Sequence, residues 1–522
     1  MSLHGQFFAT ARRCRSQLAI ADSTGQKLTY GRALTAVLLF AKQIRRRTPD
    51  ERMIGLLLPA SAGGAVANIA TLAAGRIPVN LNFTAGEDSM AVAIERCGIR
   101  TIITSKKFLE KAGISLKPTP PGSPAPELVF LEDIRAGIGW ADKLAAAVEA
   151  RMMPLGALKK RYGPVANKDA LATVIFSSGS TGTPKGVMLS HRNILANIEG
   201  FADIFPMTAD DCFIGVLPFF HSFGLTGTLW FPMLSGCAVV FHPNPMDAKV
   251  VGELAATFKG TMLIATPTFV NAYMRRCTKE QFANIHHVVV GAEKLRQPIA
   301  NAFTAQFGIE LTEGYGCTEM SPVVAVNTAH AGVAQPSKQG TVGRAVKGVQ
   351  AKVVDQHTGE GPLVGREGLL LVKGDNLMLG YLGEPERTAE AIRDGWYQTG
   401  DIASIDEDGF ITITDRLSRF SKIAGEMVPH LKIEDAINDV LGEACAAVTA
   451  VPDDARGERL VAFYTKMDVD PAHVWDQLSK TSLPKLWLPR RDNIFAIESL
   501  PTLGSGKLDL RGLRELAQRY AG

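Results

Sequence analysis

The sequence predicts an α/β protein with a large N-terminal domain of parallel α/β layers, a β-rich subdomain, and a small α+β domain at the C-terminus. Three observations lead to this prediction. Short β-rich runs alternate with Ala- and Leu-rich stretches in the first part of the chain, strands follow one another from about residue 340, and residues 418–522 carry helices and strands of their own. A chain of 522 residues is also too long for one compact core.

The alternating first part predicts a parallel sheet. Segment 61–75, "SAGGAVANIATLAAG", is expected to be a helix. Five apolar runs are expected to be strands, at 53–59, 101–105, 172–179, 212–218 and 287–293. Ligands of such folds bind at the C-terminal ends of the strands, so the residues that follow each run are candidates for a site.

The later part of the chain predicts two further units. The runs "QAKVVD", "EGLLLVKG" and "GFITITDR" indicate a β-rich subdomain over about 340–417 without intervening helices, which completes an N-terminal domain of residues 1–417. A boundary is expected near Leu417, and residues 418–522 then form the small domain. Its expected elements are helices at 432–442 and 472–482 and strands at 446–453 and 458–466.

Composition excludes several classes of protein. Lys and Arg number 56 against 52 Asp and Glu, and a net charge of +4 gives no broad field for nucleic acid, so we expect no nucleic-acid partner. The seven Cys are scattered singly without metal-ligand spacing, which favours a reducing compartment. No secretory signal is expected, and no apolar run reaches the ~18 residues that span a bilayer. We therefore expect a cytoplasmic protein, with any membrane contact peripheral at the inner face.

Residues 177–186, "SSGSTGTPKG", have the composition of a phosphate-binding loop. The glycines let the backbone turn and expose N–H groups, the hydroxyls donate hydrogen bonds, and the lysine adds positive charge. Flexible linkers share this composition, but this stretch directly follows a buried-looking strand. It is not a Walker loop, because the Gly-to-Lys spacing differs and no Ser or Thr follows the lysine. The candidate ligands are Ser177, Ser178, Gly179, Ser180, Thr181, Gly182, Thr183 and Lys185.

This loop resembles the phosphate-loop signature of the adenylate-forming enzymes, the family of acyl-CoA synthetases, luciferases and peptide-synthetase adenylation domains. Five further stretches resemble motifs of that family in the same order: "LPFFHSFG" at 217, "VVVGAEKL" at 288, "EGYGCTE" at 313, "WYQTGD" at 396 and "LPTLGSGK" at 500. Within the family, "LPFFHSFGLTGTL", "RFSKIAGEMV" and "LPTLGSGK" most resemble bacterial acyl–acyl-carrier-protein synthetases that are joined to a 2-acylglycerophosphoethanolamine acyltransferase.

The resemblance implies an activity. A fatty acid would be activated with ATP and Mg²⁺ to an acyl-adenylate with release of pyrophosphate, and the acyl group would then pass to the phosphopantetheine thiol of acyl carrier protein. A fatty acyl-CoA ligase with CoA as acceptor is the alternative. A non-catalytic regulator that binds nucleotide or acyl-adenylate is a third possibility, against which the retention of the charged motif residues argues.

The resemblance also implies roles for the motif residues around the nucleotide. Tyr315 would stack on or beside the adenine, Thr318 would contact phosphate, and Glu319 would bind Mg²⁺, which suits a hard carboxylate. From the local sequence alone, Tyr315 could equally be a core aromatic and Glu319 an exposed carboxylate. Neighbouring Cys317 is not expected to be a nucleophile, because no base partner is suggested.

Other motif residues would surround the adenosine. The resemblance places Gly291, Ala292 and Glu293 on the adenine side, although a turn at the end of a strand would look similar. It gives Asp401 and Arg416 the two ribose contacts. Taken without the family motifs, these two residues could be halves of surface ion pairs.

Two residues are expected to act at the reacting carboxylate. His221, among phenylalanines, is assigned a gating or orienting role, although a lone His in apolar surroundings is usually a core residue. Lys507 would reach from the small domain to the carboxylate and α-phosphate and balance developing charge. The small domain would then rotate about a pivot near Arg416. Ser418 replaces the usual charged residue there, and His430 replaces a usual proline.

The substrate and acceptor are less fixed by sequence. "FGLTGTLWFPML" offers an apolar wall for an acyl chain, although a packed core would look the same. Basic residues of the small domain could steer an acidic carrier protein: Lys422, Lys432, Arg490 and Arg491. None of the ten His is followed four residues later by Asp, so lysophospholipid acylation would need a separate acyltransferase chain.

Overall fold

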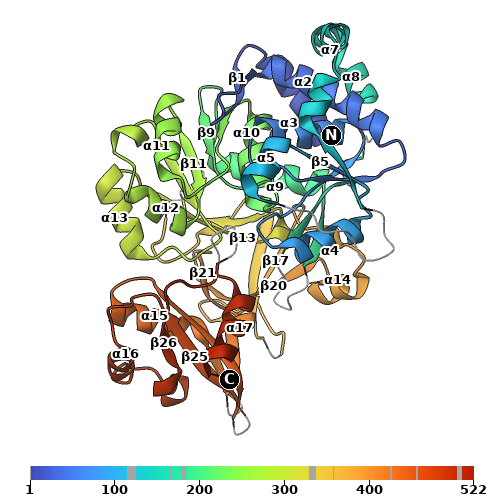
Figure 1. Ribbon diagram of the computed structural model, residues 1–522. Helices are drawn as coiled ribbons and strands as arrows, with labels where there is room; N and C mark the ends of the chain where they lie inside the picture. The colour runs from blue at the N-terminus through green and yellow to red at the C-terminus, as the bar shows by residue number, and fades with distance from the viewer. Residues whose placement is uncertain are drawn as a thin grey trace.

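A computed structural model describes residues 2–114, 125–163, 167–177, 184–328, 337–356, 358–423, 426–453, 456–502 and 508–521. Its centre is a nine-stranded sheet in the order β15-β14-β13-β12-β11-β9-β10-β1-β2 (Figure 1). Strands β13, β12, β11, β9, β10 and β1 are mutually parallel, and the outer pairs are antiparallel. The strand bounds are β1 (Leu18–Asp22), β2 (Lys27–Thr29), β9 (Cys212–Gly215), β10 (Ala238–Phe241), β11 (Met262–Ala265), β12 (His287–Val290), β13 (Leu311–Gly316), β14 (Val323–Val326) and β15 (Arg344–Ala345).

A second, fully parallel sheet has the order β4-β3-β5-β6. Its strands are β3 (Met53–Leu56), β4 (Ile77–Asn80), β5 (Thr101–Thr104) and β6 (Glu127–Phe130). Helix α3 (Ala62–Ala73) connects β3 to β4, and nearly all of its residues are buried because they are small or apolar. Its first turn is capped by the Ser61 hydroxyl, which accepts from the Gly64 N–H at 3.1 Å. The prediction of an α/β fold with parallel layers is therefore confirmed.

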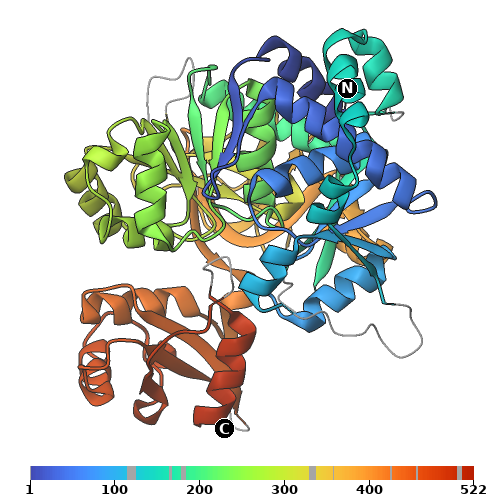
Figure 2. The ribbon, with the colours of Figure 1, turned by 45° about the horizontal axis from the view of Figure 1, so that its top comes forward.

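The remaining helices of the first part lie on both sides of these sheets (Figures 1 and 2). They are α1 (Leu3–Arg13), α2 (Tyr30–Arg47), α4 (Glu87–Cys97), α5 (Lys106–Ala112), α6 (Leu131–Ala136), α7 (Trp140–Met152), α8 (Leu155–Arg161), α9 (His191–Ile204), α10 (Phe231–Ser235), α11 (Ala248–Thr257), α12 (Pro267–Met274) and α13 (Gln297–Phe307). A seven-residue π-helix, η1 (Gly224–Trp230), precedes α10. None of the helices described here is long and apolar enough to cross a membrane.

The phosphate-loop candidate joins two antiparallel strands. Strands β7 (Leu171–Ser177) and β8 (Lys185–Ser190) pair with each other, with Ser177 opposite Lys185, and β18 (Gly380–Tyr381) pairs with the other edge of β8. The parallel arrangement expected for 172–179 is therefore wrong, because an apolar run reads the same in either direction. The hairpin still brings both ends of the loop to one point.

The β-rich subdomain differs from expectation in one respect. Its sheet has the order β16-β17-β20-β19, with β21 on β20. Its strands are β16 (Val349–Val354), β17 (Gly368–Gly374), β19 (Ile392–Arg393), β20 (Trp396–Ile405) and β21 (Ile411–Arg416). Helix α14 (Pro385–Ala391) interrupts this series, so the expectation of no intervening helix is wrong. None of its seven residues is buried, and a sequence without an apolar face gives no periodic signal.

The C-terminal part has its own packed interior. Two hydrophobic clusters are formed only by residues from Ile423 onward, on either side of a sheet of order β24-β25-β26. The elements are η4 (Leu417–Arg419), β22 (Phe420–Ile423), β23 (Glu426–Pro429), α15 (His430–Leu441), β24 (Ala446–Asp453), β25 (Gly457–Tyr464), α16 (Pro471–Leu478), β26 (Ile494–Ala496) and α17 (Leu510–Ala521). The exact boundary near Leu417 stays a prediction.

One acidic residue links the two parts of the chain. Asp435 in α15 lies 3.0 Å from Lys294 Nζ and 3.3 Å from Arg296 Nη2. Both cations lie just after β12, in the segment that carries the expected adenine contacts. Figures 1 and 2 show α15 below the nine-stranded sheet in both views.

Candidate active site

Two adjacent parallel strands end at the candidate site. Gly291 directly follows β12, and Tyr315 lies near the end of β13, which leads into the 3₁₀ turn η3 (Thr318–Met320). Close backbone packing explains the glycines here. A Cβ at Gly316 would meet the Pro322 carbonyl at 2.1 Å, and one at Gly291 would lie 3.0 Å from the Gly314 carbonyl. Ala292 adopts a φ of +72°, a conformation that concentrates at ligand sites.

The two expected ribose ligands contact each other. Asp401 in β20 and Arg416 in β21 are cross-strand partners, and Arg416 Nε lies 3.1 Å from Asp401 Oδ1. The Tyr315 hydroxyl donates to the other oxygen, Oδ2, at 2.5 Å. The Asp401 carboxylate raises the pKa of Arg416 further, so the guanidinium keeps its charge. A carboxylate fixed at both oxygens is rigid, as a ligand-binding group must be.

Thr318 and Glu319 lie between elements that are distant in sequence. The Ser222 hydroxyl donates to Thr318 Oγ1 at 3.3 Å, which joins the segment after β9 to η3. Glu319 is buried, and its Oε1 accepts from the Tyr381 hydroxyl at 2.9 Å. No cluster of three or more His, Cys, Asp or Glu that could hold a metal is found in the described ranges. One carboxylate is nonetheless enough for Mg²⁺ when substrate phosphates complete the coordination.

Lys185 lies near Glu319 and shares Tyr381 with it as a contact. Its ammonium lies over the Tyr381 ring, 5.2 Å from the centroid. Burial lowers the pKa of Lys185, and the charges of Arg387, Glu319 and Arg416 act on it too. Ser177 is described as the strand residue opposite Lys185. The other loop candidates, at 178–183, lie outside the described residues, as does Lys507.

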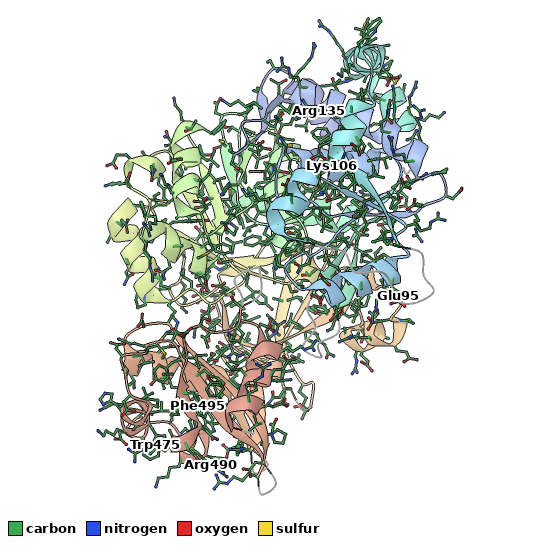
Figure 3. The ribbon with its side chains drawn as sticks, in the orientation of Figure 1. Glu95, Lys106, Arg135, Trp475, Arg490 and Phe495 are labelled. Atoms are coloured by element: carbon green, nitrogen blue, oxygen red, sulfur yellow. The ribbon has the colours of Figure 1, made fainter. Side chains whose placement is uncertain are left out.

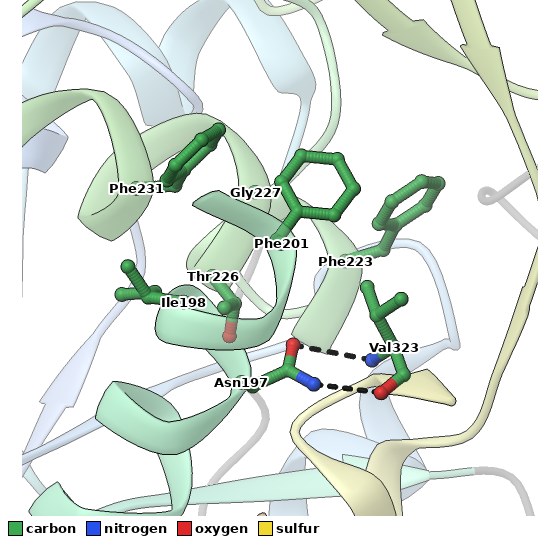
Figure 4. A pocket seen from close by; sticks show the side chains of 8 residues that line it. All are labelled: Asn197, Ile198, Phe201, Phe223, Thr226, Gly227, Phe231 and Val323. Atoms are coloured by element: carbon green, nitrogen blue, oxygen red, sulfur yellow. Dashed lines mark hydrogen bonds between the residues drawn. The ribbon is translucent and has the colours of Figure 1, made fainter. Parts of the chain in front are cut away.

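His221 contacts the backbone of Phe223, an apolar residue of the same motif. Its Nδ1 accepts from the Phe223 N–H at 3.4 Å, so in the neutral ring the proton lies on Nε2. Phe223 is also one wall of a small cavity of about 10 Å³ between α9 and η1 (Figure 4). The cavity is also lined by Asn197, Ile198, Phe201, Thr226, Gly227, Phe231 and Val323.

Two further motif residues have contacts that bear on their expected roles. Glu293 Oε2 accepts from the Thr268 hydroxyl at 2.7 Å and its N–H at 3.2 Å, so this carboxylate is engaged with the first turn of α12. Burial raises the pKa of the Cys317 thiol well above its ordinary value, with Glu319 and Asp401 adding to the shift. A thiol held neutral is a poor nucleophile, in agreement with the expectation for Cys317.

Arg419, beside the expected pivot, pairs with the buried Glu434 of α15. Burial raises the pKa of that carboxyl, whereas the Arg419 charge opposes the rise. Ser421 Oγ lies 2.7 Å from the His430 Nε2. Arg419 and His430, the second of which departs from the family pattern, thus form contacts within the small domain.

Three residues of the site were missed by sequence reasoning. Tyr381 links Lys185 to Glu319, Glu313 accepts from the Leu295 N–H at 3.1 Å, and Asp435 pairs with Lys294 and Arg296. Only Glu313 lies inside a quoted motif. Its position in "EGYGCTE", where a carboxylate interrupts a strand, was the available signal.

The structure also brings together a His–Asp pair that is separated by five residues in the sequence. His242 and Asp247 are five residues apart, and His242 Nε2 lies 3.6 Å from Asp247 Oδ2. The other ring nitrogen is 2.9 Å from the Ser23 hydroxyl. His242 is buried at the end of β10. The need for a separate acyltransferase chain stays a prediction.

Residues 7–382 match the family described as AMP-binding enzyme. The chain belongs to this family. This AMP-binding enzyme is 32% identical over 354 residues to 4-coumarate–CoA ligase 1 of Arabidopsis thaliana, in an alignment that covers 66% of this chain and 63% of that relative. It is 33% identical over 357 residues to a long-chain-fatty-acid–CoA ligase of Salmonella typhimurium, covering 67% and 62%. A match to 4-coumarate–CoA ligase 5 of Oryza sativa subsp. japonica reaches 98% of this chain and 94% of the relative, at 29% identity.

Solved structures confirm the fold of this AMP-binding enzyme. ATP-bound MatB from Rhodopseudomonas palustris superposes with a TM-score of 0.81 at 26% identity, covering 99% of both chains. The apo form of MatB superposes with a lower TM-score, 0.70, at the same identity and coverage. Because those two structures are of one protein, the difference reflects conformation. As a whole, this chain therefore superposes better on the ATP-bound structure than on the apo structure.

Proposed function

We propose that this protein is an AMP-forming acid–CoA ligase that activates an apolar carboxylic acid, in the first place a fatty acid. One observation carries the proposal. A rigid Tyr315–Asp401–Arg416 group lies near a buried carboxylate, Glu319, and a half-buried cation, Lys185. A diol, a metal and a polyphosphate are the ligands that these three features suit, in that order.

The adenylation step balances with these groups. An oxygen of the substrate carboxylate attacks the α-phosphorus of ATP, the bond to the β-phosphate oxygen breaks, and pyrophosphate leaves with the electron pair. Glu319 would hold Mg²⁺, which when bound offsets the charge of the leaving phosphates. Thr318 and Lys185 would contact phosphate oxygens, and Asp401 would accept from the ribose hydroxyls. Lys507 is proposed to balance charge at the carboxylate and α-phosphate.

In the second step the thiol sulfur attacks the acyl carbon of the mixed anhydride, the bond from that carbon to the phosphate oxygen breaks, AMP leaves with the electron pair, and the thiol proton is released to solvent. His221, with its ring proton on Nε2, is proposed to orient the acyl carboxyl group rather than to act as a base. Gly291 and Ala292 are proposed to line the adenine. The Glu293 side chain would act indirectly, by holding this segment against α12.

The proposed acyl site is the cavity between α9 and η1. Phe201, Phe223 and Phe231 make it apolar, and the Asn197 side chain is hydrogen-bonded to both the N–H and the carbonyl of Val323 (Figure 4). A volume of about 10 Å³ holds no more than one water, so an acyl chain enters only when these rings move. The relatives named above act on a long-chain fatty acid or on 4-coumarate, which makes an aromatic acid the competing substrate class.

We propose CoA as the acceptor, the alternative raised from the sequence, because the named relatives are CoA ligases. The contacts of the small domain also offer little that favours a carrier protein. Arg490, at its surface (Figure 3), lies 3.0 Å from Asp453, and Arg491 lies 3.6 Å from Asp476. Cations that already face carboxylates attract an acidic partner weakly. The side chain of Lys422 lies outside the described set.

Direct competition tests the acceptor. CoA and holo-acyl carrier protein are supplied at equal concentration with ATP and an acid that supports adenylation, and the two thioesters are separated and counted. We expect thioester chiefly on CoA, with little dependence on salt. Thioester formed chiefly on the carrier protein, at a rate that falls as salt is added, would contradict CoA as the acceptor and favour an acyl-carrier-protein synthetase. The proposal of adenylation would still stand.

A further inference from the structure

Tyr381 touches both charged groups of the proposed phosphate site. Its hydroxyl donates to Glu319 Oε1 at 2.9 Å, and the face of its ring lies under the Lys185 ammonium, 5.2 Å away. The side chain is only 3% exposed. No motif that pointed to the function contains it.

The backbone of Tyr381 is fixed relative to β8, the strand that begins with Lys185. It lies in β18, which pairs with β8, and Tyr381 stands opposite Val187, two residues after Lys185. The Tyr381 N–H donates to Thr388 Oγ1 at 2.9 Å. The backbone of Tyr381 is therefore held against the strand that begins with Lys185, while its side chain extends to Glu319.

The same segment holds the turn that carries Glu319. Met378 N–H donates to the Glu319 carbonyl at 2.8 Å, and Asn376 Nδ2 donates to the Met320 carbonyl at 2.7 Å. In addition, the Ser321 hydroxyl donates a hydrogen bond to the Asn376 carbonyl at 2.9 Å. Backbone and side chain thus set the position of the carboxylate together.

The direction of the Tyr381 hydroxyl is determined by its partners. An ionised carboxylate can only accept, so Tyr381 must donate to Glu319. Its oxygen is then available to accept from the nearby Tyr397 hydroxyl. With Oε1 engaged in this way, Oε2 is the oxygen of Glu319 that can turn toward a cation.

We propose that Tyr381 is a positioning residue of the adenylation reaction. Its hydroxyl orients the Glu319 carboxylate for Mg²⁺, and its ring holds the Lys185 ammonium in place by a cation–π contact. Tyr381 thereby fixes the position of the metal ligand relative to the cation of the phosphate loop. This inference rests on the proposed function, in which Glu319 binds the metal. A hydrogen bond to a charged group and a cation–π contact in a buried site are each strong enough to affect ligand affinity about tenfold.

Metal binding can be read without turnover. Mn²⁺ is titrated into the complex of the full chain with a non-hydrolysable ATP analogue, β,γ-imido-ATP, and free Mn²⁺ is followed by electron paramagnetic resonance. For Tyr381→Phe, which keeps the ring, we expect Mn²⁺ affinity to fall about tenfold and metal-free nucleotide affinity to stay unchanged. For Tyr381→Leu, the affinity for metal-free nucleotide should fall several-fold as well, because the aromatic ring that contacts the Lys185 ammonium is lost.

Controls separate this inference from the proposed function. Tyr273→Phe removes one buried hydroxyl whose bond goes to the Pro245 carbonyl, far from the metal ligand, and should match wild type. Wild-type protein that takes up no Mn²⁺, or Glu319→Gln that binds it normally, would overturn the metal role of Glu319 itself. A wild-type site abolished by Glu319→Gln but unchanged in Tyr381→Phe would overturn the role of Tyr381 alone.

A double-mutant cycle and a second variant complete the test. In the Glu319→Gln background, Tyr381→Phe should cause no further loss, because the two side chains act on one site. If Tyr381→Phe does not fold, as judged by its thermal transition, Tyr397→Phe takes its place. That variant leaves Tyr381 intact and frees its hydroxyl to turn, and we expect a two- to fivefold loss of Mn²⁺ affinity. Unchanged affinity in Tyr397→Phe would then overturn the inference.

Discussion

Arg416 and Asp401 face each other across β20 and β21 as direct cross-strand partners, with Arg416 Nε 3.1 Å from Asp401 Oδ1. The Tyr315 hydroxyl takes the other carboxylate oxygen. Tyr315 thus connects the nine-stranded sheet to this pair in the β-rich subdomain, at the point where a nucleotide sugar is proposed to bind.

Replacing this carboxylate should weaken nucleotide binding selectively. For Asp401→Asn we expect ATP affinity, measured by calorimetry, to fall about ten- to hundredfold, because a charged acceptor is lost and Arg416 keeps an unpaired charge. Asp406→Asn is the matched control, since Asp406 lies in a turn of the same subdomain and pairs with Lys338 at 2.5 Å. Equal ATP affinity in Asp401→Asn and wild type would remove the ribose role.

Lys507→Ala should separate the two half-reactions. Loss of one oriented charge is worth about 3 kcal/mol at a transition state, so adenylation should slow roughly a hundredfold or more. Thioester formation from supplied acyl-adenylate should proceed as in wild type. A parallel fall in both half-reactions would show that Lys507 serves a general structural purpose and not the first step.

Asp435→Asn should loosen the contact between the two parts of the chain. Its partners Lys294 and Arg296 are at the surface, and exposed pairs contribute about 1 kcal/mol or less, so the ratio of adenylation to thioester formation should shift no more than about fivefold. The shift should vanish at high salt. Asp439→Asn, one helical turn further along α15 and exposed, is the control. A ratio unchanged at low salt would mean that this contact does not influence domain arrangement.

Glu313 should make stability depend on pH. Burial raises the pKa of its carboxyl to about 7 from 4.5. Between these two values the folded protein binds more protons than the unfolded chain, so the contribution to stability is full below pH 4.5 and is lost as pH rises toward 7. Glu313→Gln keeps an acceptor for the Leu295 N–H, and at pH 8 it should be more stable than wild type by about 2 kcal/mol.

The same variant should match wild type near pH 4.5, where both side chains are largely neutral. Urea unfolding at the two pH values provides the comparison. Glu310→Gln, an exposed carboxylate three residues earlier, should show no such dependence. If Glu313→Gln were equally stable relative to wild type at both pH values, Glu313 would not titrate as described.

Sequence placed the candidate residues in contiguous motifs. "EGYGCTE" and "WYQTGD" carry Tyr315 and Asp401, which meet in the structure although their strands, β13 and β20, belong to different sheets. The antiparallel pairing of β7 and β8 was not predictable, because an apolar run records burial and not direction. Tyr381 and Asp435 were missed for another reason. Their partners are 62 and 141 residues away, and a single tyrosine or aspartate carries no pattern that indicates a distant contact.

The central claim is that these groups together activate a carboxylate, and ATP–pyrophosphate exchange measures that step directly. Purified protein is incubated with ATP, Mg²⁺ and labelled pyrophosphate over straight-chain fatty acids of increasing length, with 4-coumarate as the aromatic comparison and no CoA present. We expect exchange that depends on the acid, peaks within the fatty-acid series and is lost in Glu319→Gln. Protein that binds ATP but supports no exchange with any of these acids would contradict the account and favour a non-catalytic nucleotide-binding role.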